Sequence, residues 1–355
     1  MSEFRIDQIK SQDASRGPDV AGITTFTGTS GIVMPSGDTA YRGGRDRGLF
    51  MGGYTTSPAN AAVKRIDYVT ISTLGNSINF GDLANAARWA GGSCGSSTRA
   101  FYGGGTTPTS QDHIDFVITS STGSAMDFAN LHAARGYVEA CSNSIRGIWG
   151  GGRSSPGNDT DTIQYITMAT NADGVDFGNL TQPRTGTANV ANPTRALFCG
   201  GYITPLSAAP YNVTDYVTIS TTGNAKDFGD LRVATDYSDS AGSSTRAVIG
   251  GGQAAPGSRT QSMTYFTFSS LGNGLNFGDL TTGRNSLAAC GSDTRGLFSG
   301  GRSSSSTYTN IIDYITIASA GNATDFGDLT EGRNGVAGCS DGTRGLFGGG
   351  YASAV

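Results

Sequence analysis

The sequence contains few residues of the kinds on which most enzyme active sites depend. Only two of its 355 residues are histidines, His113 and His132, and neither has a partner at a metal-ligand spacing. No phosphate-binding P-loop and no H-E-x-x-H motif occurs in the chain. We therefore predict that the protein is not an enzyme and that it needs no cofactor or metal ion.

Lysine and charge in general are also scarce. Three lysines (Lys10, Lys64 and Lys226) stand against 21 arginines, charged residues make up 15% of the chain, and the net charge is -4. This balance offers no basic surface for nucleic acid. No apolar run approaches the ~20 residues of a membrane span, and the polar first 20 residues argue against a secretory signal. We expect a soluble protein, made in the cytoplasm, that neither binds nucleic acid nor inserts into membranes.

Glycine, by contrast, is abundant and recurs at regular positions. The chain has 55 glycines, against a usual share of ~7%. Many belong to one phrase that returns seven times, at Asp46–Gly53 (DRGLFMGG), Thr98–Gly105 (TRAFYGGG), Ile145–Gly152, Thr194–Gly201, Thr245–Gly252, Thr294–Gly301 and Thr343–Gly350 (TRGLFGGG). A period near 50 residues with paired glycines is typical of β-propeller blades.

Each repeat contains four predicted strands, which we name a to d. Strand a consists of small residues, and strand b is the glycine phrase. Strand c is an Asp-Tyr-Ile-Thr-Ile phrase, and strand d is an Asp-Phe-Gly-Asp-Leu phrase. Strands a, c and d occur six times and strand b seven times, about 25 strands in all, whereas six blades need 24 and seven need 28. We predict an all-β, six-bladed propeller in which the segment from Gly335 completes the blade begun by Ile66–Leu83. A seven-bladed ring remains the alternative.

The order of double glycine, loop, aromatic strand and outer strand resembles kelch repeats over about 300 residues, with Phe replacing Trp on strand d. The strand phrases, and the opening segments Met1–Lys10, Val20–Phe26 and Thr27–Ser36, are similar to repeat proteins of large marine tailed phages of the cyanophage type. This resemblance implies a virion structural protein: a fibre or decoration of tail, neck or head that is assembled in the host cytoplasm.

Residues 1–45 are unlike the repeats. They contain two β-prone pieces, Ile23–Phe26 and Gly31–Met34, separated by glycine, proline and serine, and they are too few to form a core of their own. We predict that residues 1–45 form an attachment or oligomerisation arm for other virion proteins, and that 46–355 form the propeller. Virion appendages are commonly trimeric, so a homotrimer is the first expectation. The alternative is an arm that packs along its own propeller.

Arginine recurs at two positions of the repeat. The first position begins strand b, and we predict a structural clamp there; its members are Arg47, Arg99, Arg146, Arg195, Arg246, Arg295 and Arg344. The second follows strand d. We expect the acids of strand d to cap turns and to pair with these arginines between blades.

The loops between strands b and c vary most in length and in amino-acid sequence, as recognition loops on a constant frame do. Candidate recognition residues in them are Tyr54, Arg153, Tyr202, Tyr211, Arg302 and Tyr308. Their rings can stack on a host-surface glycan or dock on another virion protein. A carbohydrate-binding, lectin-like receptor module is therefore the alternative function, and neutral surface loops are the simplest explanation.

Overall fold

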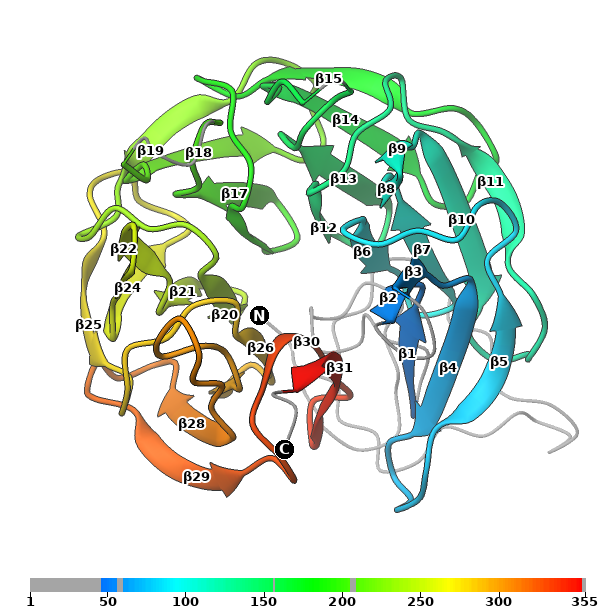
Figure 1. Cartoon of the computed structure of the whole chain (residues 1–355). Helices are drawn as coiled ribbons and strands as arrows, with labels where there is room; N and C mark the ends of the chain where they lie inside the picture. Colours follow the sequence, from blue (N-terminus) through cyan, green and yellow to red (C-terminus); the bar gives the residue numbers. More distant parts are fainter. Residues whose placement is uncertain (1–45, 56–59, 156, 205–208, 353–355) are drawn as a thin grey trace, which may run out of the picture. The chain divides into compact units, whose positions relative to one another are not determined.

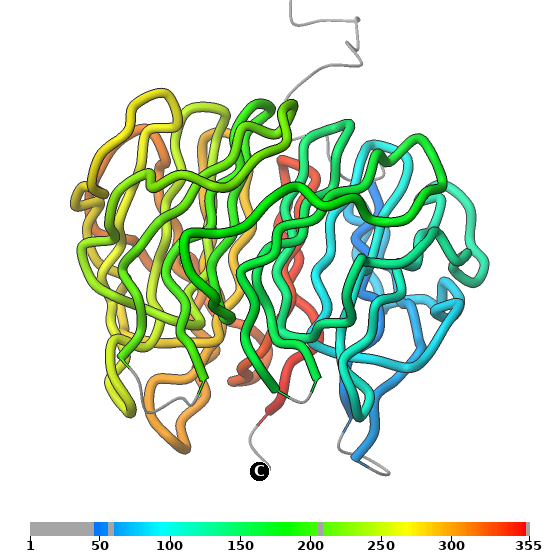
Figure 2. Tube along the Cα trace, turned by 90° about the horizontal axis from the view of Figure 1, so that it is seen from above, coloured from blue at the N-terminus to red at the C-terminus, as the bar shows by residue number. Residues whose placement is uncertain are grey.

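The computed structural model describes residues 46–55, 60–155, 157–204 and 209–352, and its regular elements in these ranges are all strands. No helix in the described residues is long and apolar enough to cross a membrane. The strands form six blades, which Figure 1 shows arranged in a ring, and Figure 2 shows the blades running between two faces that carry the loops. A cavity of about 320 Å³, which we call the channel, lies among the inner strands of the ring. The predicted all-β, six-bladed propeller is confirmed.

Five blades have four antiparallel strands each, ordered a to d from the channel outwards. Blade 2 consists of β6 (Gly92–Gly95), β7 (Arg99–Gly103), β10 (His113–Ile118) and β11 (Met126–Asn130). Blade 3 consists of β12 (Glu139–Ser142), β13 (Arg146–Gly150), β14 (Thr162–Thr167) and β15 (Val175–Asn179). Blade 4 consists of β16 (Ala188–Ala191), β17 (Arg195–Cys199), β18 (Val213–Thr218) and β19 (Lys226–Asp230). Blade 5 consists of β20 (Asp239–Gly242), β21 (Arg246–Gly250), β24 (Ser262–Thr267) and β25 (Leu275–Asp279). Blade 6 consists of β26 (Ala288–Gly291), β27 (Arg295–Ser299), β28 (Ile311–Thr316) and β29 (Thr324–Asp328).

The two ends of the repeat array are built differently. Among the described residues, blade 1 has strands b, c and d: β1 (Arg47–Met51), β4 (Arg65–Thr70) and β5 (Ile78–Asp82). The C-terminal strands β30 (Arg333–Ser340) and β31 (Gly345–Ala352) pair with each other and with no other described strand, and we call them the terminal hairpin. Short strand pairs extend three of the b–c loops: β2 (Tyr54–Thr55) with β3 (Ala61–Ala62), β8 (Thr106–Thr107) with β9 (Thr109–Ser110), and β22 (Gln253–Ala255) with β23 (Ser258–Arg259).

The predicted closure of the ring is wrong. Strand β30 does not complete blade 1, because β1 pairs with β4 alone and β30 pairs with β31. The reason is local. Strands β30 and β31 reproduce the strand a–strand b hairpin of the other blades, as β26 and β27 do, so β30 meets its antiparallel partner across a tight turn. The seventh copy of strand b therefore belongs to its own hairpin.

The terminal hairpin still occupies a place in the ring. At the end of strand b, a glycine of one blade packs against the large side chain of the next blade's strand b. A Cβ added at Gly103 would lie 2.8 Å from the Trp149 ring, and one at Gly348 would lie 2.7 Å from the Phe50 ring. The hairpin thus precedes blade 1 as blade 2 precedes blade 3.

The first set of arginines joins neighbouring blades. Six of the seven guanidinium groups, those of all members but Arg344, lie over the aromatic ring of their own strand c, at 4.4 to 5.0 Å from the ring centroid. Six, those of all members but Arg295, donate to the carbonyl that follows strand c in the next blade of the described chain. Hydrogen bonds of this kind run from Arg47 to Thr119, Arg99 to Met168, Arg146 to Ile219, Arg195 to Phe268, Arg246 to Ile317 and Arg344 to Ile71.

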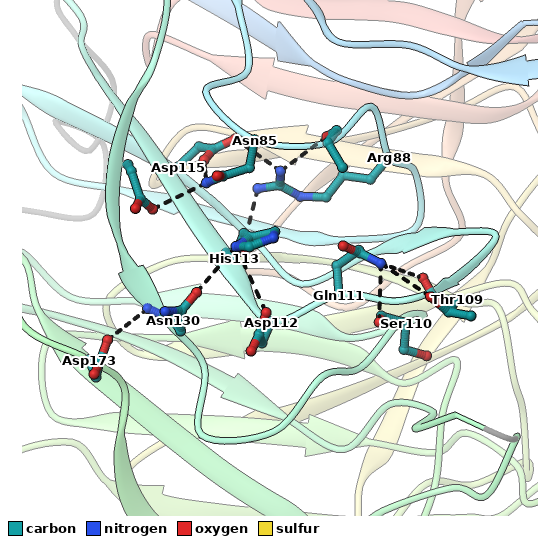
Figure 3. A network of polar contacts seen from close by, with 12 residues as sticks. Asn85, Arg88, Thr109, Ser110, Gln111, Asp112, His113, Asp115, Asn130 and Asp173 are labelled. Atoms are coloured by element: carbon teal, nitrogen blue, oxygen red, sulfur yellow. Dashed lines mark hydrogen bonds and ion pairs between the residues drawn. The ribbon is translucent and has the colours of Figure 1, made fainter.

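Three arginines of the second set form buried ion pairs between blades, but their partners on strand c differ from the strand d acids that we predicted. Guanidinium–carboxylate distances of 2.9 to 3.0 Å join Arg88 to Asp115, Arg184 to Asp215 and Arg284 to Asp313, with both side chains fully buried. These aspartates lie on strand c, where the sheet shields them from water. Acids of strand d instead cap their own turn; the Asp227 carboxylate, for example, accepts from the Gly229 amide. Figure 3 shows the Arg88 network, in which Asn85 also donates to Asp115.

Removing one member of a buried pair leaves an uncompensated charge. We predict that Arg184→Met lowers the free energy of unfolding by about 3–5 kcal/mol, because Asp215 then lacks its cation. The matched control is Arg65→Met, whose pair with Asp67 is exposed and is worth at most about 1 kcal/mol. Urea unfolding measures both. Equal, small losses in the two variants would contradict the assignment.

Candidate functional site

A ring of unusual backbone conformations surrounds one end of the channel. In each repeat, the second residue after the second arginine position enters strand a with a positive φ. The members are Ala90, Tyr137, Gly186, Tyr237, Ser286 and Gly335, with φ between 49° and 65°. Backbone hydrogen bonds link neighbours around the ring, such as Tyr137 N to Ala90 O at 2.7 Å and Ser286 N to Tyr237 O at 2.9 Å.

Two of these six positions carry tyrosine. A left-handed conformation costs a bulky L-residue of order 1–3 kcal/mol; glycine avoids that cost at 186 and 335, whereas alanine and serine adopt the same conformation at 90 and 286. The presence of tyrosine at positions 137 and 237, despite this cost, therefore calls for an explanation. Strain of this kind is concentrated at functional sites, so these two residues are the starting point for the candidate site.

Aromatic side chains run outward from Tyr137. Its ring centroid lies 5.3 Å from that of Trp89, which in turn lies 5.6 Å from that of Tyr54, and both pairs meet edge to face. Tyr54 is exposed, whereas Trp89 and Tyr137 are half-buried. The three side chains come from different repeats and form one row.

Arg153 lies at the centre of the polar part of the site. Its guanidinium is 5.3 Å from the Tyr137 ring centroid, and it donates to the Tyr202 hydroxyl at 3.3 Å and to Thr204 at 2.6 Å. Asp159 accepts from Nε at 3.2 Å. These contacts hold the planar cation in one orientation beside an aromatic face.

Tyr237 completes the site on the other side of Arg153. Its hydroxyl is 2.7 Å from that of Tyr202, and burial together with this hydrogen bond raises the pKa of Tyr237. The hydroxyl therefore remains protonated and can both donate and accept. We call Tyr54, Trp89, Tyr137, Arg153, Tyr202 and Tyr237 the aromatic–arginine cluster.

The structure divides the six predicted recognition residues. Tyr54, Arg153 and Tyr202 belong to the cluster, although Tyr202 is only 1% exposed and supports the site rather than offering a surface. Tyr211 makes no ring contact with the cluster and is half-buried. Arg302 and Tyr308 pair with each other on blade 6, where Tyr308 contacts Tyr351 at 5.6 Å.

Sequence reasoning missed Trp89, Tyr137 and Tyr237, because they precede strand a and lie outside the variable b–c loops. A signal was present for two of them. At the same position of the repeat other blades have alanine, glycine or serine, so a tyrosine in a slot for small residues is the anomaly.

Carboxylates continue the site into the channel. Glu139 and Asp239 begin the inner strands β12 and β20, two residues after Tyr137 and Tyr237. Water reaches Glu139, but the surrounding protein disfavours its charge, and this desolvation together with Asp239 raises its pKa to about 8. Burial raises the pKa of Asp239 to about 6, against the opposing effect of amide donors from Ser240 and Ala289.

The site combines aromatic faces, hydroxyls, one cation and two carboxyls whose pKa values are raised. This set suits a neutral, polyhydroxylated ligand, because rings stack on apolar sugar faces while the polar groups bond to hydroxyls. Among the described residues, no group of three or more His, Cys, Asp and Glu side chains is arranged to hold a metal ion. His113 contacts Asn130 and Asp112 (Figure 3), apart from the cluster.

The chain is similar to the solved structure of YjhT. The TM-score is 0.63, the identity is 14%, and the match covers 75% of this chain and 91% of YjhT. At this identity the likeness to YjhT shows the propeller fold alone. No family model and no curated protein matches the chain.

The raised pKa of Glu139 predicts a pH dependence of stability. The folded carboxyl has a raised pKa, and because solvent reaches the side chain and screens its charge, the folded state loses a small amount of stability as the pH rises above 4.5. We expect Glu139→Gln to match the wild-type Tm at pH 4 and to exceed it at pH 8. The control is Asp82→Asn at an exposed position of β5. A difference for Glu139→Gln that does not grow between pH 4 and 8 would contradict this account.

Proposed function

We propose that the protein is a non-enzymatic virion component whose propeller is a rigid head that recognises carbohydrate on a host surface. The observation that carries the recognition part is the aromatic–arginine cluster, in which Tyr137 and Tyr237 keep strained backbones at the channel mouth. The virion part is supported by the resemblance of the strand phrases and of the opening segments to marine phage repeat proteins.

Carbohydrate is the ligand class that the cluster favours. Trp89, Tyr137 and the exposed Tyr54 offer adjacent apolar ring surfaces, and Arg153 with Tyr237 offers donors and acceptors beside them. Most of these side chains are already held by contacts within the protein. Little conformational entropy would therefore be lost on binding, which favours a preformed recognition site.

The frame around the site suits an exposed head. Arginine contacts between blades and buried ion pairs recur around the ring. They give the face that carries the loops a stiff support. The proposed attachment arm, residues 1–45, lies outside the described residues. In this proposal it binds other virion proteins and forms the homo-oligomer, a trimer in the first instance.

A free lectin-like receptor module is the second candidate, because the same cluster would serve it. The two functions differ in location. Peptide mass spectrometry of purified virus particles, with copy number measured against the major capsid protein, separates them. We expect a fixed copy number per particle. Absence from clean particles would remove the virion function and leave the lectin.

Carbohydrate recognition has its own test. We predict that Tyr137→Gly weakens glycan binding at least tenfold, equivalent to ~1.4 kcal/mol, while changing stability little, because glycine accepts the positive φ. Tyr308→Ala, on blade 6, is the control and should bind as the wild type does. A glycan array followed by calorimetry measures this. A wild-type protein that binds no glycan, or full binding by Tyr137→Gly, would refute the proposal.

A further inference from the structure

The aromatic–arginine cluster is built on a backbone support that repeats from blade 2 to blade 6. In each of these blades, the residue after the second arginine position forms a backbone bridge with the residue after the glycine phrase. The bridges join Trp89 to Thr106, Gly136 to Arg153, Thr185 to Tyr202, Asp236 to Gln253, and Asn285 to Arg302. The support is therefore the same in each blade, whereas the side chains on it differ.

The aromatic rings of the cluster lie along one arc of the channel mouth, from blade 1 to blade 5. The position that holds Tyr137 in blade 3 and Tyr237 in blade 5 holds Ser286 in blade 6. Arg302 of blade 6 therefore has a serine where Arg153 has a tyrosine ring. A purely structural role would call for the same side chains in every blade. The restriction of the rings to one arc indicates instead a ligand that follows this arc.

Successive contacts along the arc are nearly equal in length. The ring centroids of Tyr54 and Trp89 lie 5.6 Å apart, and those of Trp89 and Tyr137 lie 5.3 Å apart. The Arg153 guanidinium follows at 5.3 Å from the Tyr137 ring, and the last two tyrosines of the cluster lie 5.5 Å apart. One sugar unit of an extended chain is similar in length to one such step, so the whole arc is longer than a single sugar.

The charges around the arc favour a neutral ligand. Arg153 is the only cation of the cluster, and its Nε already donates to the Asp159 carboxylate at 3.2 Å. Glu139 and Asp239, which begin the inner strands beside the arc, have raised pKa values because their surroundings disfavour negative charge. An acidic sugar or a phosphate chain would meet the same surroundings with one guanidinium, already paired, to offset its charge.

We infer that the cluster binds an extended, neutral oligosaccharide of at least three sugar units, one for each of Tyr54, Trp89 and Tyr137, rather than a single terminal sugar. Arg153 and the hydroxyls beside it would bond to the unit after Tyr137. Tyr54 is 51% exposed at the blade 1 end, so it contacts only a chain that extends beyond Trp89. The inference rests on the proposed function, because it specifies the carbohydrate that the same site would take.

The dependence of binding on chain length tests the inference. The full chain is applied to an array that carries linear glucose, galactose, mannose and N-acetylglucosamine oligomers of one to six units, and calorimetry then gives the affinities for the series that binds. We expect the affinity to rise at least tenfold, equivalent to ~1.4 kcal/mol, from the disaccharide to the hexasaccharide, because longer chains contact more rings.

The variant Tyr54→Ala tests the outer end of the arc. We expect it to bind the hexasaccharide at least tenfold more weakly than the wild type does, and the disaccharide equally well. Its exposed position makes a loss of folding unnecessary for this effect, and an unchanged Tm verifies that. The matched control is Tyr351→Ala on the terminal hairpin, where the tyrosine is 49% exposed and lies outside the cluster; both affinities should be unchanged.

The outcomes separate this inference from the proposed function. Affinity that rises with chain length, and a loss confined to long chains in Tyr54→Ala, support it. Equal affinity for one and six units, or a response of Tyr54→Ala that is absent or independent of length, would overturn the inference and leave carbohydrate recognition standing. Binding to none of the oligomers would refute both. Stronger binding to oligogalacturonate or single-stranded oligothymidylate on the same array would also overturn it, in favour of an acidic chain.

Discussion

The arginine that begins strand b is the contact on which the ring depends. It lies over an aromatic ring of its own blade and donates to a carbonyl of the next, so a single side chain sets both the spacing and the order of neighbouring blades. Guanidinium suits this task because its flat face stacks while its edge donates. The contact requires a complete strand c in the following blade. After blade 6 no strand c follows among the described residues; there Arg295 still stacks on Tyr314, no described carbonyl accepts from its guanidinium, and Phe326 is exposed.

The candidate site depends on the same frame. A tyrosine with positive φ is maintained only where its surroundings hold the backbone, and at the channel mouth neighbouring blades hold it through the linked amides of Ala90, Tyr137 and their equivalents. In the proposed function, the ligand therefore meets side chains whose backbone is held in place by neighbouring blades. The variable b–c loops contribute Arg153 and Tyr202 to the site. The aromatic side chains at its centre come from the segment that leads into strand a.

Much of the fold could be predicted because each blade is specified locally. The strand b and strand c phrases each carry the residue pattern of a strand and the turn residues that follow it. Seven copies of strand b, against six of each other strand, correctly predicted one extra strand b at an end of the array. The partner of that extra strand could not be predicted, because β30 carries the residue pattern of strand a whether it pairs with β31 or with β1. The site was half predicted: Arg153 and Tyr54 stood out as loop residues, but the backbone conformation that marks Tyr137 and Tyr237 has no sequence signature beyond a large residue in a small slot.

Hydrogen–deuterium exchange of the full chain, resolved to individual strands, tests the central claim that the arginine contact holds neighbouring blades together. In Arg146→Met, which loses the hydrogen bond to the Ile219 carbonyl, we expect faster exchange of the amides of β13 and β18, on the two sides of that junction, while β24 in blade 5 exchanges as in the wild type. Unchanged exchange at the junction, or equal acceleration in every blade, would contradict the account.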